Sequence, residues 1–361
     1  MPERGAEAPH YLQSIVLTVT QGATGIRTFN LCLIGFGTVG RGLVGLLQRK
    51  SDDLRGRYGI TFRITGLATR RLGWLVAPQG FTPEKILNGD FSEAGKAAGL
   101  RDWLRDSEAN VLFEASSLNP ETGEPAVTHI RAALEAGAHA ISANKGPVVY
   151  AYRELSQLAQ ARGVRFFFES AMMDGAPVFS LFRQTLPAIE VHGFRGVLNS
   201  TTNVILECME SGMSFDEAVR QAQRLGVAET DPSNDIDGID AAVKVIGLAN
   251  VLMGGSLTLK DVTRQGIRDL TAGQLHAAHE SGEKWKLISR ARRESDGSIT
   301  ASVAPERIRA DDPLYAVRGT SLAVGFQTDI FRELFISERD PGPEATAYGM
   351  LCDFINAVRS T

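Results

Sequence analysis

Short apolar runs alternate with helical patterns through the first half of the chain. Between the runs, apolar residues recur every three or four positions, as in an amphipathic helix, at 43–47, 124–136 and 152–162. Strands alternating with helices are typical of an α/β fold with a doubly wound parallel sheet of the Rossmann type. The runs that we predict to be strands lie at 29–34, 62–68, 110–115, 139–142 and 164–168.

The pattern changes after Ser170. Long helices are predicted at 214–225 and 238–252, with strands near 191–198 and 298–303. The segment after Asp312 carries its own strand and a final helix at 344–358, long enough to fold back over the first half. We therefore expect an N-terminal arm, a first domain, a second α+β domain and a returning C-terminal segment, with bounds 1–28, 29–170, 171–312 and 313–361.

Composition and charge reduce the number of function classes that fit the chain. The formal net charge is −4, with no basic run that would bind nucleic acid. The apolar stretch 11–19 follows acidic residues and lacks a cleavage site, and no stretch reaches the ~20 apolar residues of a membrane span. Three widely spaced cysteines suit a reducing cytoplasm. Small-molecule chemistry in the cytoplasm is therefore favoured over a membrane or nucleic-acid partner.

A glycine-rich turn follows the first predicted strand and opens the first helix. Glycines at this place let the backbone approach a pyrophosphate, and the helix N-terminus supplies N–H donors. The same spacing can serve tight packing alone, but its position in a βαβ unit favours dinucleotide binding. The residues expected around the cofactor are Gly35, Phe36, Gly37, Thr38, Val39 and Gly40.

The end of the second predicted strand bears on cofactor choice. An NAD enzyme usually has Asp or Glu there, whereas this chain has Thr69, Arg70 and Arg71. Two guanidinium groups suit a 2′-phosphate, although surface arginines are common. We expect a preference for NADP over NAD.

Two lysines stand where substrate chemistry is expected. Asn144 and Lys145 follow the strand 139–142 and lead toward the nicotinamide half of the cleft. Asp237, Asp240 and Lys244 are predicted to share one helical face. An exposed ion pair or a metal site would also fit these carboxylates. Carboxylates before an apolar helix can instead bind an ammonium group while the lysine faces a carbonyl oxygen.

Several segments in order resemble the homoserine dehydrogenase family from Phe29 onward. Several separate motifs in the order of the family are far more specific than any one of them. They lie at 34–40, 143–147, 196–203, 225–232 and 235–244.

The resemblance implies NAD(P)-dependent interconversion of L-aspartate 4-semialdehyde and L-homoserine, a step toward threonine and methionine. It implies that Lys145 and Lys244 flank the carbonyl and that Asp240 supports Lys244. We favour Lys244 as the proton donor, with Lys145 as the alternative. The residues implied to bind the amino-acid end of the substrate, or to lie beside it, are Glu229, Asp235, Ser200 and Thr201.

The family also holds a monovalent cation, Na⁺ or K⁺, in the loop that here spans 168–177. The implied ligands are Glu169 and the loop positions Met172, Asp174 and Ala176, with backbone carbonyls contributing. Family members contact each other through the second domain, which implies a homodimer. No length remains after the last predicted helix for a regulatory domain, so we expect the short form.

Some positions depart from the family pattern. Ser200 and Val227 replace a common glycine and tyrosine, and Met173 and Asp174 replace small residues. A relative that reduces a different small aldehyde or ketone is therefore the first alternative. A non-catalytic dinucleotide-binding protein is the second, but Lys145, Asp240 and Lys244 are all present.

Overall fold

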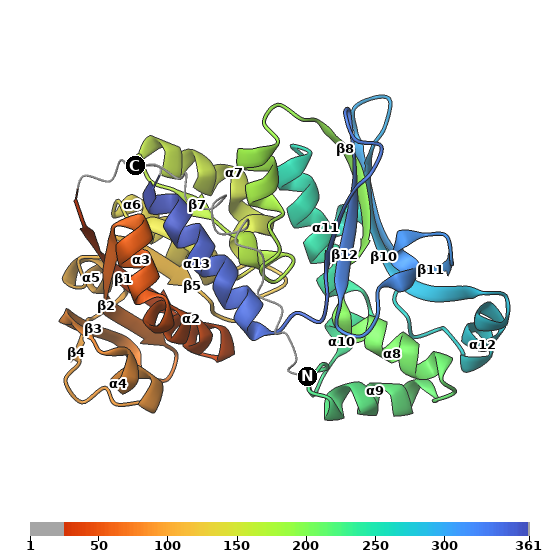
Figure 1. Ribbon diagram of the computed structural model, residues 1–361, viewed down its shortest axis with the longest axis horizontal. Coiled ribbons are helices and arrows are strands. Elements are labelled where there is room, and N and C mark those ends of the chain that lie inside the picture. Colours follow the sequence, from red (N-terminus) through yellow and green to blue (C-terminus); the bar gives the residue numbers. More distant parts are fainter. Residues whose placement is uncertain (1–24, 360–361) are drawn as a thin grey trace, which may run out of the picture.

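The structure, a computed structural model, describes residues 25–359 and contains two β-sheets joined side by side (Figure 1). The apolar stretch 11–19 and most of the expected N-terminal arm lie outside the described residues. Within 25–359, no helix is both long and apolar enough to cross a membrane.

The first sheet has seven strands in the order β4-β3-β2-β1-β5-β6-β7. The neighbours β2, β1, β5, β6 and β7 pair in parallel, whereas β3 and β4 add an antiparallel edge. The predicted doubly wound parallel sheet is confirmed. The strands are β1 (Arg27–Ile34), β2 (Ile60–Thr69), β3 (Gly73–Phe81), β4 (Gly95–Lys96), β5 (Val111–Glu114), β6 (His139–Ser142) and β7 (Phe166–Phe167).

Helices cover both faces of this sheet because alternate residues of its strands are apolar on both sides. Leu31 and Leu33 of β1 pack with one helical layer, and Cys32 and Ile34 pack with the other. The first layer is α2 (Thr38–Arg49), α3 (Ser51–Tyr58) and α13 (Pro343–Arg359), and the second includes α5 (Leu100–Asp106), α6 (Ala126–Glu135) and α7 (Gly146–Ala161). A short helix, α4 (Pro83–Asn88), follows β3.

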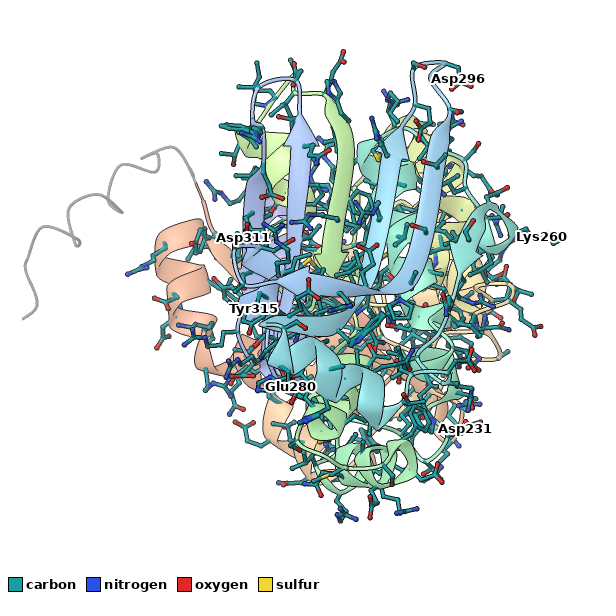
Figure 2. The ribbon with its side chains drawn as sticks, turned by 90° about the vertical axis from the view of Figure 1, so that its right-hand side faces the viewer. Asp231, Lys260, Glu280, Asp296, Asp311 and Tyr315 are labelled. Carbon is teal, nitrogen blue, oxygen red and sulfur yellow. The ribbon has the colours of Figure 1, made fainter. Side chains whose placement is uncertain are left out.

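The second sheet has six strands in the order β13-β12-β8-β10-β11-β9. Figure 2 shows these strands running lengthwise, with Asp296 in the β10–β11 turn at one end and Asp231 beyond the other. The strands are β8 (Val191–Val197), β9 (Val262–Arg264), β10 (Glu283–Arg293), β11 (Ile299–Arg309), β12 (Leu322–Thr328) and β13 (Leu334–Glu338). The helices are α8 (Ser200–Glu210), α9 (Phe215–Arg224), α10 (Ser233–Ile236), α11 (Ile239–Leu252) and α12 (Ala272–Glu280).

Segment 313–361 divides between the two parts of the molecule. The expectation that it returns as a whole to the first domain is wrong, because β12 pairs with β8 and so extends the second sheet. Only α13 returns, and its Phe354 ring packs edge-on against Phe29 of β1 and Phe113 of β5 at 5.9 Å. The chain thus crosses between the two sheets after residue 170 and again after 338.

Candidate active site

The three glycines of the turn between β1 and α2 have different steric surroundings. Gly35 has φ +88°, and a Cβ there would lie 2.4 Å from the carbonyl oxygen of Ala115. A Cβ on Gly40 would lie 2.5 Å from the carbonyl oxygen of Gly35. A Cβ on Gly37 would meet no atom within 4 Å. Gly35 and Gly40 therefore permit the turn itself, whereas Gly37 keeps the space in front of it open.

A cavity of about 750 Å³ opens beside this turn. Gly35, Phe36 and Gly37 form one side of it, and Arg70 stands at the end of β2. Thr38 and Val39 begin α2, whose N-cap Gly37 offers no capping side chain. Arg71 is exposed next to Arg70. An open helix N-terminus beside a glycine turn is suited to the pyrophosphate of a dinucleotide, so the residues fit that cofactor.

Asn144 fixes the loop that carries Lys145. Its side-chain nitrogen donates to the carbonyl oxygens of Ser116 at 3.0 Å and Ser117 at 3.3 Å. Its side-chain oxygen accepts from the backbone N–H of Gly146 at 2.8 Å. The loops after β5 and β6 are thereby joined at the cavity wall, and Lys145 follows directly as the N-cap of α7.

Asp240 brings the two predicted lysines together. Lys145 Nζ lies 3.1 Å from Asp240 Oδ1, and Lys244 Nζ lies 3.6 Å from Asp240 Oδ2. Lys244 Nζ also donates to the carbonyl oxygen of Leu198 at 2.6 Å, and the residue is only 9% exposed. One carboxylate thus bridges a lysine of the dinucleotide domain and a lysine of the second domain.

Electrostatic interactions favour the charged forms of Lys145 and Asp240. The charge of Asp240 raises the pKa of Lys145 above its ordinary value, against the opposing effect of burial. Burial also disfavours the charged form of Asp240, but Lys145 and Lys244 outweigh it and hold its pKa well below the usual range. The cluster therefore presents a protonated amine at Lys145.

Asn199, which the sequence interpretation did not single out, orients the carboxylates. Its Nδ2 donates to Asp235 Oδ1 at 2.6 Å and to Asp240 Oδ2 at 3.1 Å. Its Oδ1 accepts from the backbone N–H of Thr202 and so caps α8. Burial, followed by the charge of Asp240, raises the pKa of Asp235. The sequence feature that could have indicated Asn199 is its position directly before an apolar helix, where asparagine is a common N-cap.

Asp237 is not part of the cluster. Gly238 has φ +73° and precedes the first residue of α11, so Asp237 lies outside the helix. Its carboxylate pairs with Arg268 Nε at 2.5 Å instead. The prediction that Asp237 shares a helical face with Asp240 and Lys244 is wrong because the left-handed glycine turns the chain between them.

The other predicted substrate residues lie at different depths. Thr201 is buried in the first turn of α8, and its hydroxyl donates to the carbonyl oxygen of Val227 at 3.2 Å. Ser200 is partly buried beside it. Glu229 is exposed in the loop between α9 and α10, where its backbone carbonyl accepts from Gln223. Glu229 thus lies on the surface while Asp235 joins the lysine cluster.

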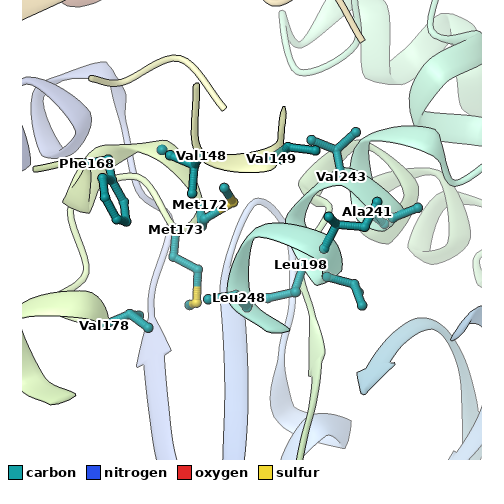
Figure 3. Packing of buried hydrophobic residues seen from close by; sticks show 14 of the residues in the cluster. Val148, Val149, Phe168, Met172, Met173, Val178, Leu198, Ala241, Val243 and Leu248 are labelled. Atoms are coloured by element: carbon teal, nitrogen blue, oxygen red, sulfur yellow. The ribbon is translucent and has the colours of Figure 1, made fainter. Parts of the chain in front are cut away.

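The loop 168–177 backs the lysine cluster with apolar side chains. Figure 3 shows Met172 and Met173 pointing into a cluster that includes Val148 of α7 and Leu248 of α11. A Cβ on Gly247 would lie 2.1 Å from Met172 Cε, so this glycine makes room for the methionine. Met172 therefore packs against the helix that carries Lys244, three residues beyond that lysine.

Both carboxylate oxygens of Glu169 are hydrogen-bonded to the backbone just beyond the loop 168–177. Its two carboxylate oxygens accept from the backbone N–H groups of Phe179 and Ser180, each at 2.6 Å. The carbonyl oxygen of Ala176 accepts from Val178 at 2.8 Å. Among residues 25–359, no group of three His, Cys, Asp or Glu side chains is arranged to hold a metal ion. A cation here would depend on backbone carbonyls and the remaining lone pairs of Glu169.

Asp174, in the same loop, and Glu338 add two carboxylates near the lysine cluster. Asp174 has φ +45°, and its Oδ1 accepts from the Thr346 hydroxyl at 3.0 Å. Burial, and then the charge of Asp174, raise the pKa of Glu338 to about 7. Glu338 Oε2 is buried without a hydrogen-bond partner among the described residues.

Comparison with known proteins identifies the family. The model of the homoserine dehydrogenase NAD-binding domain matches residues 35–169, and the homoserine dehydrogenase model matches 177–355. The chain is 36% identical over 340 residues to the NAD(+)-dependent homoserine dehydrogenase of Pseudomonas canavaninivorans, covering 92% of this chain and 97% of that protein.

Solved structures agree. A putative homoserine dehydrogenase from Archaeoglobus fulgidus superposes with a TM-score of 0.80 at 31% identity, over 91% of this chain and 98% of the other. A hyperthermophilic archaeal homoserine dehydrogenase mutant in complex with NADPH gives a TM-score of 0.78 at 27% identity, over 93% and 99%. The chain therefore belongs to the homoserine dehydrogenase family, NAD(P)-dependent oxidoreductases that act on a CH–OH group.

Proposed function

We propose that this protein interconverts L-homoserine and L-aspartate 4-semialdehyde, with Lys244 as the proton donor to the developing alkoxide. The observation that carries the proposal is Asp240 held between Lys145 and Lys244 beside the dinucleotide cavity. The comparisons do not favour the alternative, a relative that reduces a different small aldehyde or ketone.

The reaction divides between cofactor and protein. When bound, the nicotinamide supplies the hydride to the aldehyde carbon. Lys244 stabilises the resulting alkoxide and gives it a proton, and Asp240 holds the ammonium in place. Lys145 contributes a second positive charge on the nicotinamide side. Because the ammonium group is already held in position, no solvent or side chain has to reorient when negative charge develops on the substrate oxygen, and the activation free energy is lowered.

The amino-acid end of the substrate is assigned to the acidic side of the cluster. Asp235 is aligned by Asn199 and suits an ammonium group. Ser200 and Thr201 stand at the start of α8 within the same region. Glu229 would reach the substrate by movement of its exposed loop. In this arrangement the carboxylates bind the ammonium group of the substrate, and the two lysines contact the substrate oxygen on which negative charge develops.

NADP is proposed as the preferred cofactor. Arg70 lines the cavity and Arg71 is exposed beside it, so both can approach a 2′-phosphate. One relative is described as NAD(+)-dependent and one solved neighbour as an NADPH complex, so family membership alone does not decide the preference. Steady-state rates with NADP⁺ and NAD⁺ at equal concentration rank the two directly.

A monovalent cation would be held by Glu169 and the backbone carbonyls of Met172, Asp174 and Ala176. Its contribution would be to offset the buried charge of Glu169, which, after burial, raises the pKa of Asp353 to about 8. Substituting choline for K⁺ and Na⁺ should then lower thermal stability, which differential scanning calorimetry measures.

We further propose that the protein acts as a cytoplasmic homodimer through its second domain. The family resemblance supports the dimer, and three cysteines with no disulfide framework suit the reducing compartment. Analytical ultracentrifugation tests the stoichiometry. A single monomer-sized species at micromolar concentration would contradict the dimer.

The experiment that tests the function is homoserine-dependent reduction of NADP⁺ and NAD⁺ by the purified protein. Related hydroxy acids and simple alcohols serve as parallel substrates. Selective turnover of homoserine supports the proposal. Preference for another alcohol would point to a pocket altered near Ser200 and Val227 and overturn it.

A further inference from the structure

The hairpin formed by β2 and β3 places an aromatic side chain in the wall of the dinucleotide cavity. Trp74 of β3 pairs with Ala68 of β2, and Gly73 pairs with Thr69. Trp74 lines the cavity together with Ala68, Thr69 and Arg70, and it is only partly buried. The antiparallel edge that was not expected from the sequence therefore supplies part of the cavity wall.

Two neighbouring aromatic rings hold this indole in place. The Trp74 ring lies 5.3 Å from the Trp103 ring at an angle of 51°, and 6.0 Å from the His129 ring at 85°. Trp103 is fully buried, and its N–H donates to the carbonyl oxygen of Leu75 at 2.8 Å. Trp103 thus packs against the indole from the core, and His129 lines the cavity beside it.

The position of the cavity decides which half of a dinucleotide faces Trp74. The pyrophosphate belongs at the N-terminus of α2, and the nicotinamide must reach the lysine cluster beyond β6. The cavity extends from the end of β2 past β1 to the loop after β5, and Trp74 lines it at the β2 end, farther from β6. The adenosine half therefore extends toward Trp74, because the two halves diverge from the same turn.

We propose that Trp74 is the adenine-binding residue of this protein, with the adenine ring stacked on the indole and Arg70 beside the adenosine ribose. The inference rests on the proposed dinucleotide-dependent function and names one subsite of it. An aromatic face suits adenine because stacking uses the whole π surface and needs no fixed hydrogen-bond pattern. Loss of a base stack weakens binding by roughly 5- to 100-fold.

Tryptophan fluorescence titrations with the two halves of the cofactor test the proposal. The probes are adenosine 5′-monophosphate and oxidised nicotinamide mononucleotide, added to the full chain and to two variants, Trp74→Leu and Trp285→Phe. Trp285 is the matched control because it is partly buried in the second domain, where its N–H donates to Gln274. Calorimetry with adenosine monophosphate gives affinities that do not depend on the fluorescence signal.

The expected result is quenching by adenosine monophosphate in the parent and in Trp285→Phe, and little quenching by the nicotinamide half. In Trp74→Leu, the calorimetric Kd for adenosine monophosphate should rise roughly 5- to 100-fold. An unchanged Kd in a folded Trp74→Leu protein overturns the proposal. If that variant does not fold, absence of adenosine quenching in Trp285→Phe overturns it equally.

The proposed reaction and the proposed adenine subsite can be refuted separately. A parent protein that binds adenosine monophosphate through Trp74 but does not oxidise homoserine would refute the reaction and leave the subsite standing. A parent that oxidises homoserine while its Trp74→Leu variant binds the adenosine half normally would refute the subsite alone.

Discussion

Replacing Lys244 by alanine removes the group proposed to stabilise the alkoxide. Lys244 Nζ is held 2.6 Å from the Leu198 carbonyl oxygen and 3.6 Å from Asp240, at 9% exposure. Removing one preorganised electrostatic partner of a developing oxyanion costs about 10²- to 10³-fold in kcat, or roughly 3–4 kcal/mol of activation free energy. We expect a loss in that range.

The same change should leave the fold and the cofactor site intact. The lost hydrogen bond to Leu198 is worth about 1 kcal/mol, against a total stability of roughly 5–15 kcal/mol for a domain. Because Lys244 lies on the second domain, the Kd for the dinucleotide should stay within about threefold of the parent value. Thermal unfolding and fluorescence titration measure these two quantities.

The assay is initial-rate oxidation of homoserine at saturating cofactor, compared with Lys260→Ala. Lys260 is exposed at the edge of the second domain (Figure 2), and its loss should not change kcat. A folded Lys244→Ala protein with kcat within about threefold of the parent would refute the role assigned to Lys244. Lys145→Ala then shows whether the other lysine donates the proton.

Four further changes test separate parts of the site. Gly37→Val should raise the dinucleotide Kd roughly tenfold or more without lowering Tm, because the added side chain enters open space where the pyrophosphate is expected; a lowered Tm with unchanged Kd would contradict this. Arg70→Gln should raise KM for NADP⁺ roughly tenfold and leave KM for NAD⁺ nearly unchanged, and equal effects on both would contradict a 2′-phosphate contact. Burial and the charge of Asp174 raise the pKa of Glu338 to about 7, so the pH profile of kcat/KM of the parent should show an inflection near pH 7 that the profile of Glu338→Gln lacks. Identical pH profiles for the two proteins would show that the titration of Glu338 does not affect catalysis. The pKa of Asp353 is raised to about 8 from an ordinary 3.8, so between these pH values the native state holds a proton that the unfolded state has lost, and the stability falls as pH rises. The Tm of Asp353→Asn relative to the parent should therefore increase with pH up to about pH 8. Parallel curves of Tm against pH for the two proteins would refute the raised pKa.

The elements that could be predicted from the sequence are those with a continuous apolar signal. The strands β1, β5 and β6 are short runs buried on both faces, and helix α11 is apolar nearly all round. Strand β10 carried no such signal because Lys286 points into the interior. Its Nζ donates to Asn203 Oδ1 and to the Val317 carbonyl oxygen, each at 2.6 Å, and burial lowers its pKa. A buried lysine inverts the alternation that marks a strand.

The lysine cluster could be anticipated, but its geometry depended on contacts between distant segments. Asp240 and Lys244 are four residues apart on one helix, so their pairing follows from helical spacing. Lys145 reaches the same carboxylate from another domain, which only the resemblance to known enzymes suggested. Glu338 gave no sequence signal, because its burial arises where β13 leads into α13 and passes over the 174–175 loop.

Helix α13 has a consequence for the order in which the protein can fold during synthesis. The aromatic contacts of Phe354 with Phe29 and Phe113 complete the first domain's core, yet they come from the last described helix. Domains generally fold as units as the chain emerges, N-terminal first. Here α2 and α3 cover part of one face of the first sheet, and the part that α13 covers stays open until the second sheet has also been synthesised. The predicted first domain, 29–170, therefore lacks one helix of its core until the end of the chain has been made.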